Sequence, residues 1–190
     1  MDYYIRTATV DDAEAMLAIY RPYVEKTAIT FETTVPSLAE FRQRVSNTLA
    51  GYPWILAESA EEGIVGYAYA GPYKNRAAYD WTVETSIYLR HDVRGQGLGR
   101  RLYEELERIL MAMGIRNLNA CIACTDRVDD PFLTNGSVLF HEKLGYTMVG
   151  TFHSCGFKLG RWYDMLWMEK MIGPHDGAPH DIIPFSQLRA

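Results

Sequence analysis

The segment from Thr85 to Met113 constrains the fold most strongly, because it holds a strand, a glycine-rich turn and a helix in direct succession. The strand that ends at Leu89 is rich in β-branched and aromatic residues. Three glycines follow within residues 95–99, and apolar residues then recur at helical spacing up to Met113. Gly114 is placed to end that helix. This succession predicts an α/β fold in which a helix begins directly beyond the end of a strand.

The rest of the chain alternates in the same way, and the expected order of elements is β α α β β β α β α β β. Thr9 and Ser37 are predicted helix N-caps, since Asp11 and Asp12 follow the first and Glu40 completes a capping box with the second. The expected strands are 3–8, 54–58, 64–73, 78–89, 117–124, 146–157 and 162–171. Four helices are expected: one that follows Thr9, one that starts at Ser37, one from about Gly97 to Met113 and one from Ser137 to Leu144.

Length and composition limit the class of protein. The 190 residues fit one domain, and the net charge of −5 disfavours a general nucleic-acid binder, which needs a broad basic face. No apolar run approaches the roughly 18 residues of a membrane helix. Residues 1–12 do not look like a targeting segment, and three cysteines do not form a disulfide framework. We therefore expect a cytoplasmic protein with one domain, residues 1–172, and an irregular tail, residues 173–190, that a partner chain could order.

The glycine-rich turn has the properties of an anion site. The first N–H groups of a helix lack helical partners and lie at the positive end of its dipole. Between Arg90 and Arg101 there are four arginines and one aspartate, a local charge of +3 that suits a pyrophosphate. A glycine-rich loop with a structural role is the alternative. A P-loop is excluded, because no Gly-Lys-Ser or Gly-Lys-Thr follows, and a dinucleotide-binding turn would follow the first strand.

The pattern Arg94-x-x-Gly97-x-Gly99 resembles the pyrophosphate-binding signature of the GNAT acetyltransferase superfamily. The resemblance covers the chain to about Met171 and is sharpest for the phosphinothricin and methionine sulfoximine acetyltransferase branch. It implies a GNAT fold, with a mixed, mostly antiparallel central sheet of about seven strands flanked by four helices. The motifs that carry it are Tyr52-Pro-Trp54, Ala68-Tyr-Ala-Gly-Pro72, Tyr79-Asp-Trp-Thr-Val-Glu84, Leu139-Phe-His-Glu-Lys-Leu-Gly-Tyr146, Gly156-Phe-Lys158 and Trp162.

The resemblance implies acetyl-CoA as the co-substrate and assigns residues to it. The strand before the turn would pair with the pantetheine arm, the turn would cradle the pyrophosphate, and a family asparagine would contact the pantetheine. The matching residues are Ile87, Tyr88 and Leu89 for the arm, Arg94, Gly95, Gln96, Gly97, Leu98, Gly99 and Arg100 for the cradle, and Asn135 with its neighbour Ser137.

The resemblance also implies an acid–base pair, Glu84 and His141, because an ammonium group must lose a proton before it can attack a thioester. Read alone, Glu84 could be a surface residue of a strand and His141 a structural residue of a helix. A cationic clamp for an acceptor carboxylate or phosphinate would come from the loop after the third strand, and an aromatic residue between the first two helices would cover the pocket. These substrate-binding candidates are Lys74, Arg76, Tyr79 and Phe31, with solvated loop charges as the alternative for the first two.

Two cysteines, Cys121 and Cys124, have C-x-x-C spacing within an expected strand, where residues three apart point to opposite faces. No second cysteine pair or matched histidine pair accompanies them, so we expect buried strand residues and no metal. The sequence departs from many GNAT enzymes in lacking a tyrosine on the helix after Asn135 to protonate the departing thiolate. The loop 125–134 is also longer than in the herbicide-detoxifying members.

The leading prediction is acetyl transfer from acetyl-CoA to the α-amine of a small amino acid or analogue, by direct attack in a ternary complex. An acetylated enzyme is disfavoured, because no Cys or Ser lies in a recognisable nucleophile setting. The branch usually forms homodimers, which the aromatic and Met-rich strand 162–171 fits. The alternatives are an acetyltransferase for another amine, such as a protein N-terminus or a polyamine, and a non-catalytic acyl-CoA-binding module.

Overall fold

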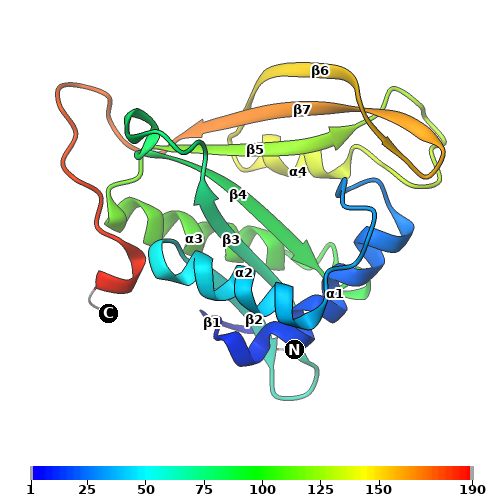
Figure 1. The fold of residues 1–190 in the computed structure, drawn as a ribbon, viewed down its shortest axis with the longest axis horizontal. Coiled ribbons are helices and arrows are strands. Elements are labelled where there is room, and N and C mark those ends of the chain that lie inside the picture. The colour runs from blue at the N-terminus through cyan, green and yellow to red at the C-terminus, as the bar shows by residue number, and fades with distance from the viewer. Residues whose placement is uncertain (1, 189–190) are drawn as a thin grey trace. The chain divides into compact units, whose positions relative to one another are not determined.

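The computed structural model describes residues 2–188 and contains seven strands and four α-helices (Figure 1). The chain divides into two compact units. The first comprises Met1–Ile19, Pro36–Leu118 and Met171–Ala190, and the second comprises Tyr20–Val35 and Asn119–Lys170. In sheet order, the first unit contributes β1-β2-β3-β4 and the second contributes β5-β7-β6. The numbers of strands and helices and their order along the chain confirm the expected pattern.

The sheet of the first unit is antiparallel throughout. Its second strand is almost completely buried, as its continuous apolar run from Trp54 to Ala57 requires. Its strands are β1 (Tyr4–Thr7), β2 (Trp54–Ser59), β3 (Gly63–Pro72) and β4 (Thr82–Leu89).

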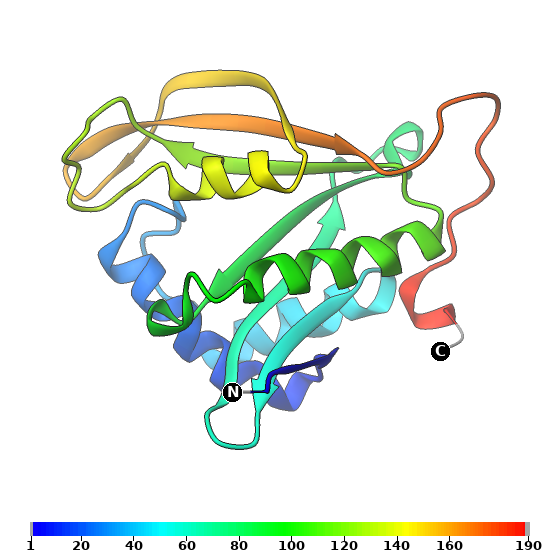
Figure 2. The same ribbon diagram turned by 180° about the vertical axis from the view of Figure 1, so that it is seen from behind.

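Helices α2 (Leu38–Gly51) and α3 (Leu98–Met113) lie on opposite faces of this sheet (Figures 1 and 2). The capping box that starts α2 is confirmed, since Ser37 Oγ accepts from the Glu40 N–H at 3.2 Å and the Glu40 carboxylate accepts from the Ser37 N–H at 2.7 Å. Helix α3 buries an apolar stripe and ends at Gly114, whose φ of 94° is left-handed, as expected of a terminating glycine. The buried stripe is Leu98, Leu102, Leu106, Leu110 and Met113.

Helix α1 (Ala13–Lys26) begins in the first unit and ends in the second. A short 3₁₀ turn, Val10–Asp12, precedes it, so the expected N-cap, Thr9, caps this turn. The N–H and Oγ1 of Thr9 both donate to the Asp12 carboxylate.

The second unit is smaller and contains three strands, helix α4 and the end of α1. Strands β6 and β7 pair antiparallel, and their register shifts between Phe152 and Gly156, where Ser154 has a φ of 47°. The small core includes Ala28, Ala123, Leu133 and Tyr163. Its elements are β5 (Asn117–Cys124), α4 (Gly136–Lys143), β6 (Thr147–Lys158) and β7 (Arg161–Met171).

One strand starts later than its composition predicts. The expected strand from Ala78 begins only at Thr82, because a 3₁₀ turn, Ala77–Tyr79, comes first. The backbone N–H groups of Tyr79 and Asp80 donate within this turn, to Arg76 and Ala77, and so are not available to a strand ladder.

The tail has little regular structure beyond a 3₁₀ turn, Phe185–Gln187, yet it hydrogen-bonds to the rest of the first unit. Trp81 Nε1 donates to the carbonyl of His180 at 2.7 Å, and the Ile183 N–H donates to the carbonyl of Met113 at 2.9 Å. The tail therefore has partners within its own chain.

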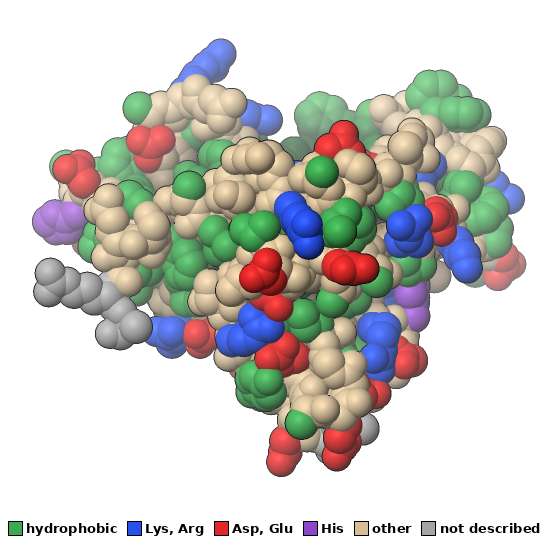
Figure 3. Space-filling view, turned by 60° about the horizontal axis from the view of Figure 1, so that its bottom comes forward, with side chains coloured by type: hydrophobic (Ala, Val, Ile, Leu, Met, Phe, Trp, Pro, Cys, Tyr) green, Lys and Arg blue, Asp and Glu red, His purple; other side chains and the backbone are tan. Residues whose placement is uncertain are grey.

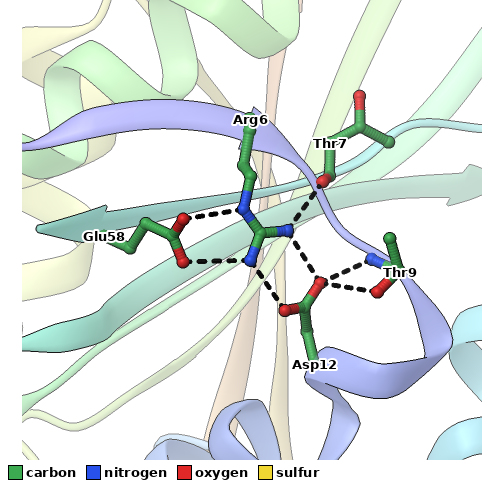
Figure 4. A network of polar contacts seen from close by, with 5 residues as sticks. All are labelled: Arg6, Thr7, Thr9, Asp12 and Glu58. Carbon is green, nitrogen blue, oxygen red and sulfur yellow. Dashed lines mark hydrogen bonds and ion pairs between the residues drawn. The ribbon is translucent and has the colours of Figure 1, made fainter. Parts of the chain in front are cut away.

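Charged groups are mixed rather than segregated on the surface that Figure 3 shows, where acidic and basic side chains lie next to one another. The best-connected example is Arg6, which donates to the Glu58 carboxylate at 2.8 and 2.9 Å and to the Asp12 carboxylate at 2.7 and 2.8 Å (Figure 4). The Arg6 guanidinium lowers the pKa of Asp12 to about 2. This network joins β1, β2 and the turn before α1.

No helix within residues 2–188 is long and apolar enough to span a bilayer.

Candidate active site

The turn between β4 and α3 has the geometry of an anion cradle. Gly97 is the N-cap of α3 with a φ of 77°, and Gly95 has a φ of 81°, so both need the left-handed freedom of glycine. A Cβ built at either position meets no atom within 4 Å. The cradle is therefore open towards a ligand, and no side chain caps the helix start. These features fit a pyrophosphate at the N-terminus of α3.

The charge around the cradle is lower than the sequence indicates. Arg90 donates to the carboxylates of Asp92 at 2.6 Å and Glu62 at 2.7 Å. Glu62 comes from the turn between β2 and β3, so local sequence does not reveal it. Arg94 and Arg100 are exposed on the turn and on the first turn of α3, where a bound anion could meet them.

The residues expected to hold the pantetheine arm lie at the end of β4. Ile87, Tyr88 and Leu89 pair with β3 along one edge of the strand. Backbone groups of a strand alternate between its two edges, so the other groups of this segment point away from β3. Opposite Leu89, β3 has Gly66, where an added Cβ would lie 2.3 Å from a Leu89 methyl carbon. This close approach fixes β4 against β3 beside the cradle.

Glu84 is half-buried in β4, opposite Gly71. Burial raises the pKa of its carboxyl group, and the nearby Lys74 partly opposes that rise. A carboxyl group with a raised pKa is a better proton acceptor than an ordinary surface glutamate.

The loop after β3 brings aromatic and cationic groups to the same unit as Glu84. The Lys74 ammonium lies 4.9 Å from the centroid of the Tyr73 ring, and the rings of Tyr73 and Tyr79 meet edge to face at 5.6 Å. Arg76 is exposed in the same loop, and its carbonyl accepts from the Tyr79 N–H. Tyr73, which sequence reasoning did not select, thus contacts two of the predicted substrate residues.

His141 lies in α4 and is only 3 % exposed. Burial lowers the pKa of its imidazole, so the ring is neutral at pH 7. Its Nδ1 lies 2.8 Å from the carbonyl of Ser137, and since a carbonyl only accepts, Nδ1 has the proton. Nε2 is then the basic nitrogen of the ring. The Tyr146 ring lies edge to face at 5.0 Å and helps to fix the imidazole.

Asn135 closes the loop that precedes α4. Its Nδ2 donates to the carbonyl of Thr125 at 2.9 Å, and its Oδ1 accepts from the Thr125 N–H at 3.3 Å. These two bonds use one donor and one acceptor of an amide that has two of each, which leaves capacity for a ligand.

Phe31 is half-buried and packs against the core cluster of the second unit. The structure therefore places the predicted residues in two groups. Glu84, Lys74, Arg76, Tyr79 and the cradle belong to the first unit, whereas His141, Asn135, Ser137 and Phe31 belong to the second. Two residues that contact the Phe31 loop, Gly156 and Lys158, were not selected as site residues, although a lysine in an apolar strand is a signal.

The cysteines have no chemistry that stands out. Cys121, Cys124 and Cys155 are free thiols, and burial raises the pKa of Cys124, with Asp164 adding to the rise. Across residues 2–188, no three His, Cys, Asp or Glu side chains gather as a metal site.

Comparison with known proteins assigns the family. Residues 5–167 match the family model described as the acetyltransferase (GNAT) domain, so the chain belongs to the GNAT acetyltransferase family. It is 37 % identical over 186 residues to a phosphinothricin N-acetyltransferase of Streptomyces viridochromogenes, a match that covers 97 % of this chain and 95 % of the relative. It is 34 % identical over 177 residues to an L-methionine sulfoximine/L-methionine sulfone acetyltransferase of Pseudomonas aeruginosa, covering 92 % and 98 %.

A solved structure is similar over its whole length. The phosphinothricin acetyltransferase of Sinorhizobium meliloti in complex with AcCoA aligns with a TM-score of 0.86 at 34 % identity, and the match covers 100 % of both chains. The expected GNAT fold is thereby confirmed.

Proposed function

We propose that this enzyme transfers the acetyl group of acetyl-CoA to the α-amine of a small amino acid or analogue, such as phosphinothricin or methionine sulfoximine. The observation that carries the proposal is the open glycine turn at the start of α3, directly beyond a strand that contains the half-buried Glu84. The names of the relatives, which match over nearly the whole chain, support the same acceptor class.

In this proposal the backbone from Gly95 to Arg100 holds the pyrophosphate, the end of β4 holds the pantetheine arm, and Asn135 and Ser137 contact the arm. The co-substrate supplies an activated thioester. Backbone N–H groups near Tyr88 would stabilise developing negative charge on oxygen.

In this proposal Glu84 and His141 are the groups that remove a proton from the acceptor ammonium. Glu84 accepts a proton of the acceptor ammonium, directly or through water, and its raised pKa suits this task. His141 is neutral, with Nδ1–H held by Ser137, and so offers Nε2 as a second proton acceptor. The raised pKa of Cys124 keeps that thiol protonated at neutral pH, which favours direct attack over an acetylated enzyme.

In this proposal the loop after β3 and Phe31 bind the acceptor. Lys74 and Arg76 offer positive charge for a carboxylate or phosphinate, and Tyr79 lines the same loop. This charge disfavours polyamines, which are cationic themselves.

The test is release of free thiol from acetyl-CoA with a panel of amino acids and analogues, including phosphinothricin and methionine sulfoximine. Glu84→Gln should lower kcat by about 10²–10⁴-fold, because the amide cannot accept the proton. Glu61→Gln, a matched change at an exposed turn residue, should leave turnover unchanged. Full activity of Glu84→Gln would show that Glu84 is not the base.

The same panel separates the alternatives. Turnover only with peptide N-termini or polyamines would replace the acceptor class. Binding of acetyl-CoA without turnover of any amine would favour the binding-module alternative.

We further propose a cytoplasmic homodimer with strand β6 at its interface. Free thiols at all three cysteines suit a reducing compartment.

Strand β6 is exposed along almost its whole length and is the last strand in the order β5-β7-β6. A long apolar edge strand needs a cover, and a second copy of the chain supplies it. The exposed apolar residues there are Met148, Val149, Phe152, Phe157 and, on β7, Trp162.

A further inference from the structure

Strand β6 contains an irregular segment, residues 153–158, that contacts the loop carrying Phe31. The irregularity begins where the register against β7 shifts. Ser154 has a left-handed φ of 47°, and its N–H donates to Asp164 Oδ1 at 2.7 Å. His153 Nδ1 lies 3.0 Å from the other oxygen of the same carboxylate. These contacts lower the pKa of Asp164, so an ionised side chain holds the bulge in place.

The bulge brings Gly156 opposite Tyr163 and against the Phe31 ring. A Cβ built at Gly156 would lie 2.1 Å from Phe31 Cε2 and 2.5 Å from Cδ2, far inside van der Waals contact. The ring thus occupies the space that any other residue at 156 would need. Glycine is required here because of the neighbouring ring, not because of its backbone angles.

Lys158 holds the residue before Phe31. Its side chain is buried, and Nζ donates to the carbonyl of Thr30 at 2.7 Å, with the carbonyl of Tyr23 at 3.5 Å. Burial lowers the pKa of the Lys158 ammonium, and Glu32 partly opposes this. Burying such a group costs free energy unless hydrogen bonds satisfy it, so its placement is specific.

The same loop is joined to the long loop before α4. The Ala28 N–H donates to the carbonyl of Phe132 at 3.0 Å. Asp130 anchors that second loop, with its carboxylate 2.9 Å from Arg161 and 3.2 Å from the Tyr163 hydroxyl. Ala28, Thr30 and Phe31 therefore each contact another segment of the second unit.

We propose that residues 153–158 form a seat for Phe31, and that Gly156 and Lys158 are positioning residues that set which acceptor side chains the enzyme accepts. This inference rests on the proposed function, in which Phe31 covers the acceptor. Neither residue needs to touch the acceptor, since both act through the position of the Phe31 loop. The proposed pyrophosphate cradle, Gly95 to Arg100, belongs to the first unit, whereas the seat belongs to the second.

The first test is Gly156→Ala. The added methyl group displaces the Phe31 ring, and the KM for a small acceptor such as methionine sulfoximine should rise about 10–100-fold, as for a displacement of about 1 Å. The KM for acetyl-CoA should stay within about twofold. The matched control is Gly51→Ala, where a Cβ meets nothing within 4 Å and wild-type constants are expected. Equal changes in both KM values would overturn the proposal.

A double-mutant cycle separates positioning from general damage. In a Phe31→Ala background the ring is gone, so Gly156→Ala should have no further effect on the acceptor KM. The double variant also removes the steric conflict, and so stays informative if Gly156→Ala alone folds poorly. Additive effects of the two changes would contradict the seat.

The third test follows the position of the Phe31 ring by NMR and does not depend on turnover. In protein labelled with 4-fluorophenylalanine, the ¹⁹F resonance that disappears in Phe31→Leu belongs to Phe31. Gly156→Ala and Lys158→Met should both shift it, whereas Lys158→Arg, which keeps a donor for Thr30, should shift it less. An unmoved resonance would refute the seat even in an active enzyme. If the wild type acetylates no amine, the proposed function fails, and the resonance still decides whether the seat exists.

Discussion

At the scale of single residues, burial changes the chemistry of the two proposed acid–base groups in opposite ways. It raises the pKa of the Glu84 carboxyl and lowers the pKa of the His141 imidazole, because in each case the charged form loses solvation. In both groups burial therefore favours the neutral form relative to a free side chain. Such perturbed pairs are characteristic of active sites.

The pKa of His141 makes a prediction about stability. Unfolded, the imidazole titrates near 6.5, and folded it titrates lower. Between these values the unfolded chain binds more protons, so the free energy of unfolding should fall as the pH drops from about 7 through the folded pKa. In the His141→Gln variant, this pH-dependent part of the free energy of unfolding should be absent. Urea unfolding of both proteins at several pH values between 7.5 and 5 measures it, and a difference between the two that does not vary with pH would contradict the assignment.

At the scale of elements, local signals decided most boundaries. Ser37 and Glu40 mark the start of α2, and Gly114 marks the end of α3, because caps depend on residues only three or four apart.

The capping box of α2 should be measurable. Ser37→Ala removes the acceptor of the Glu40 N–H and should lower the free energy of unfolding by about 1 kcal/mol. Ser46→Ala, an exposed change in the middle of the same helix, should be neutral or slightly stabilising. Chemical denaturation of the two variants tests this, and equal stabilities would argue against the cap.

What the sequence could not predict depends on contacts between distant segments. The predicted start of β4 at Ala78 was wrong, because the residues that follow Ala78 form a hydrogen-bonded turn despite their apolar composition. Glu62 reaches Arg90 from a separate turn, and Gly156 meets Phe31 across more than a hundred positions of sequence. The glycine turn, in contrast, was predicted with its helix because its residues are contiguous. The roles of Glu84, His141 and the other proposed site residues stay predictions.

At the scale of the whole molecule, the surface combines mixed charge with one apolar strand. Within residues 2–188, β6 and the adjacent part of β7 have several large apolar side chains that are more than half exposed. Isolated exposed apolar residues are ordinary, and the proposed homodimer interface rests on the run of them along this edge strand.

The homodimer can be tested by adding a charge to that strand. Phe152 is 61 % exposed, and Phe152→Glu would place a carboxylate inside the proposed interface, where burial is costly. Wild-type protein should sediment as two chains and the variant as one. Met111→Glu, an equivalent change at a 50 % exposed residue of α3, should sediment like the wild type. A monomeric wild type, or a Phe152→Glu variant that stays dimeric, would exclude this interface.

The Arg6 network also bears on the order in which the chain can fold as it is synthesised. Arg6 and Glu58 are 52 residues apart, and the strand that pairs with β1 is β2. The first strand therefore leaves the ribosome with no neighbour to pair with, and it must wait until α1, α2 and β2 have followed. A ribosome that stalls before β2 emerges would leave this strand and the Arg6 guanidinium exposed to solvent and chaperones during that interval. Folding of this layer is thus timed by the emergence of β2.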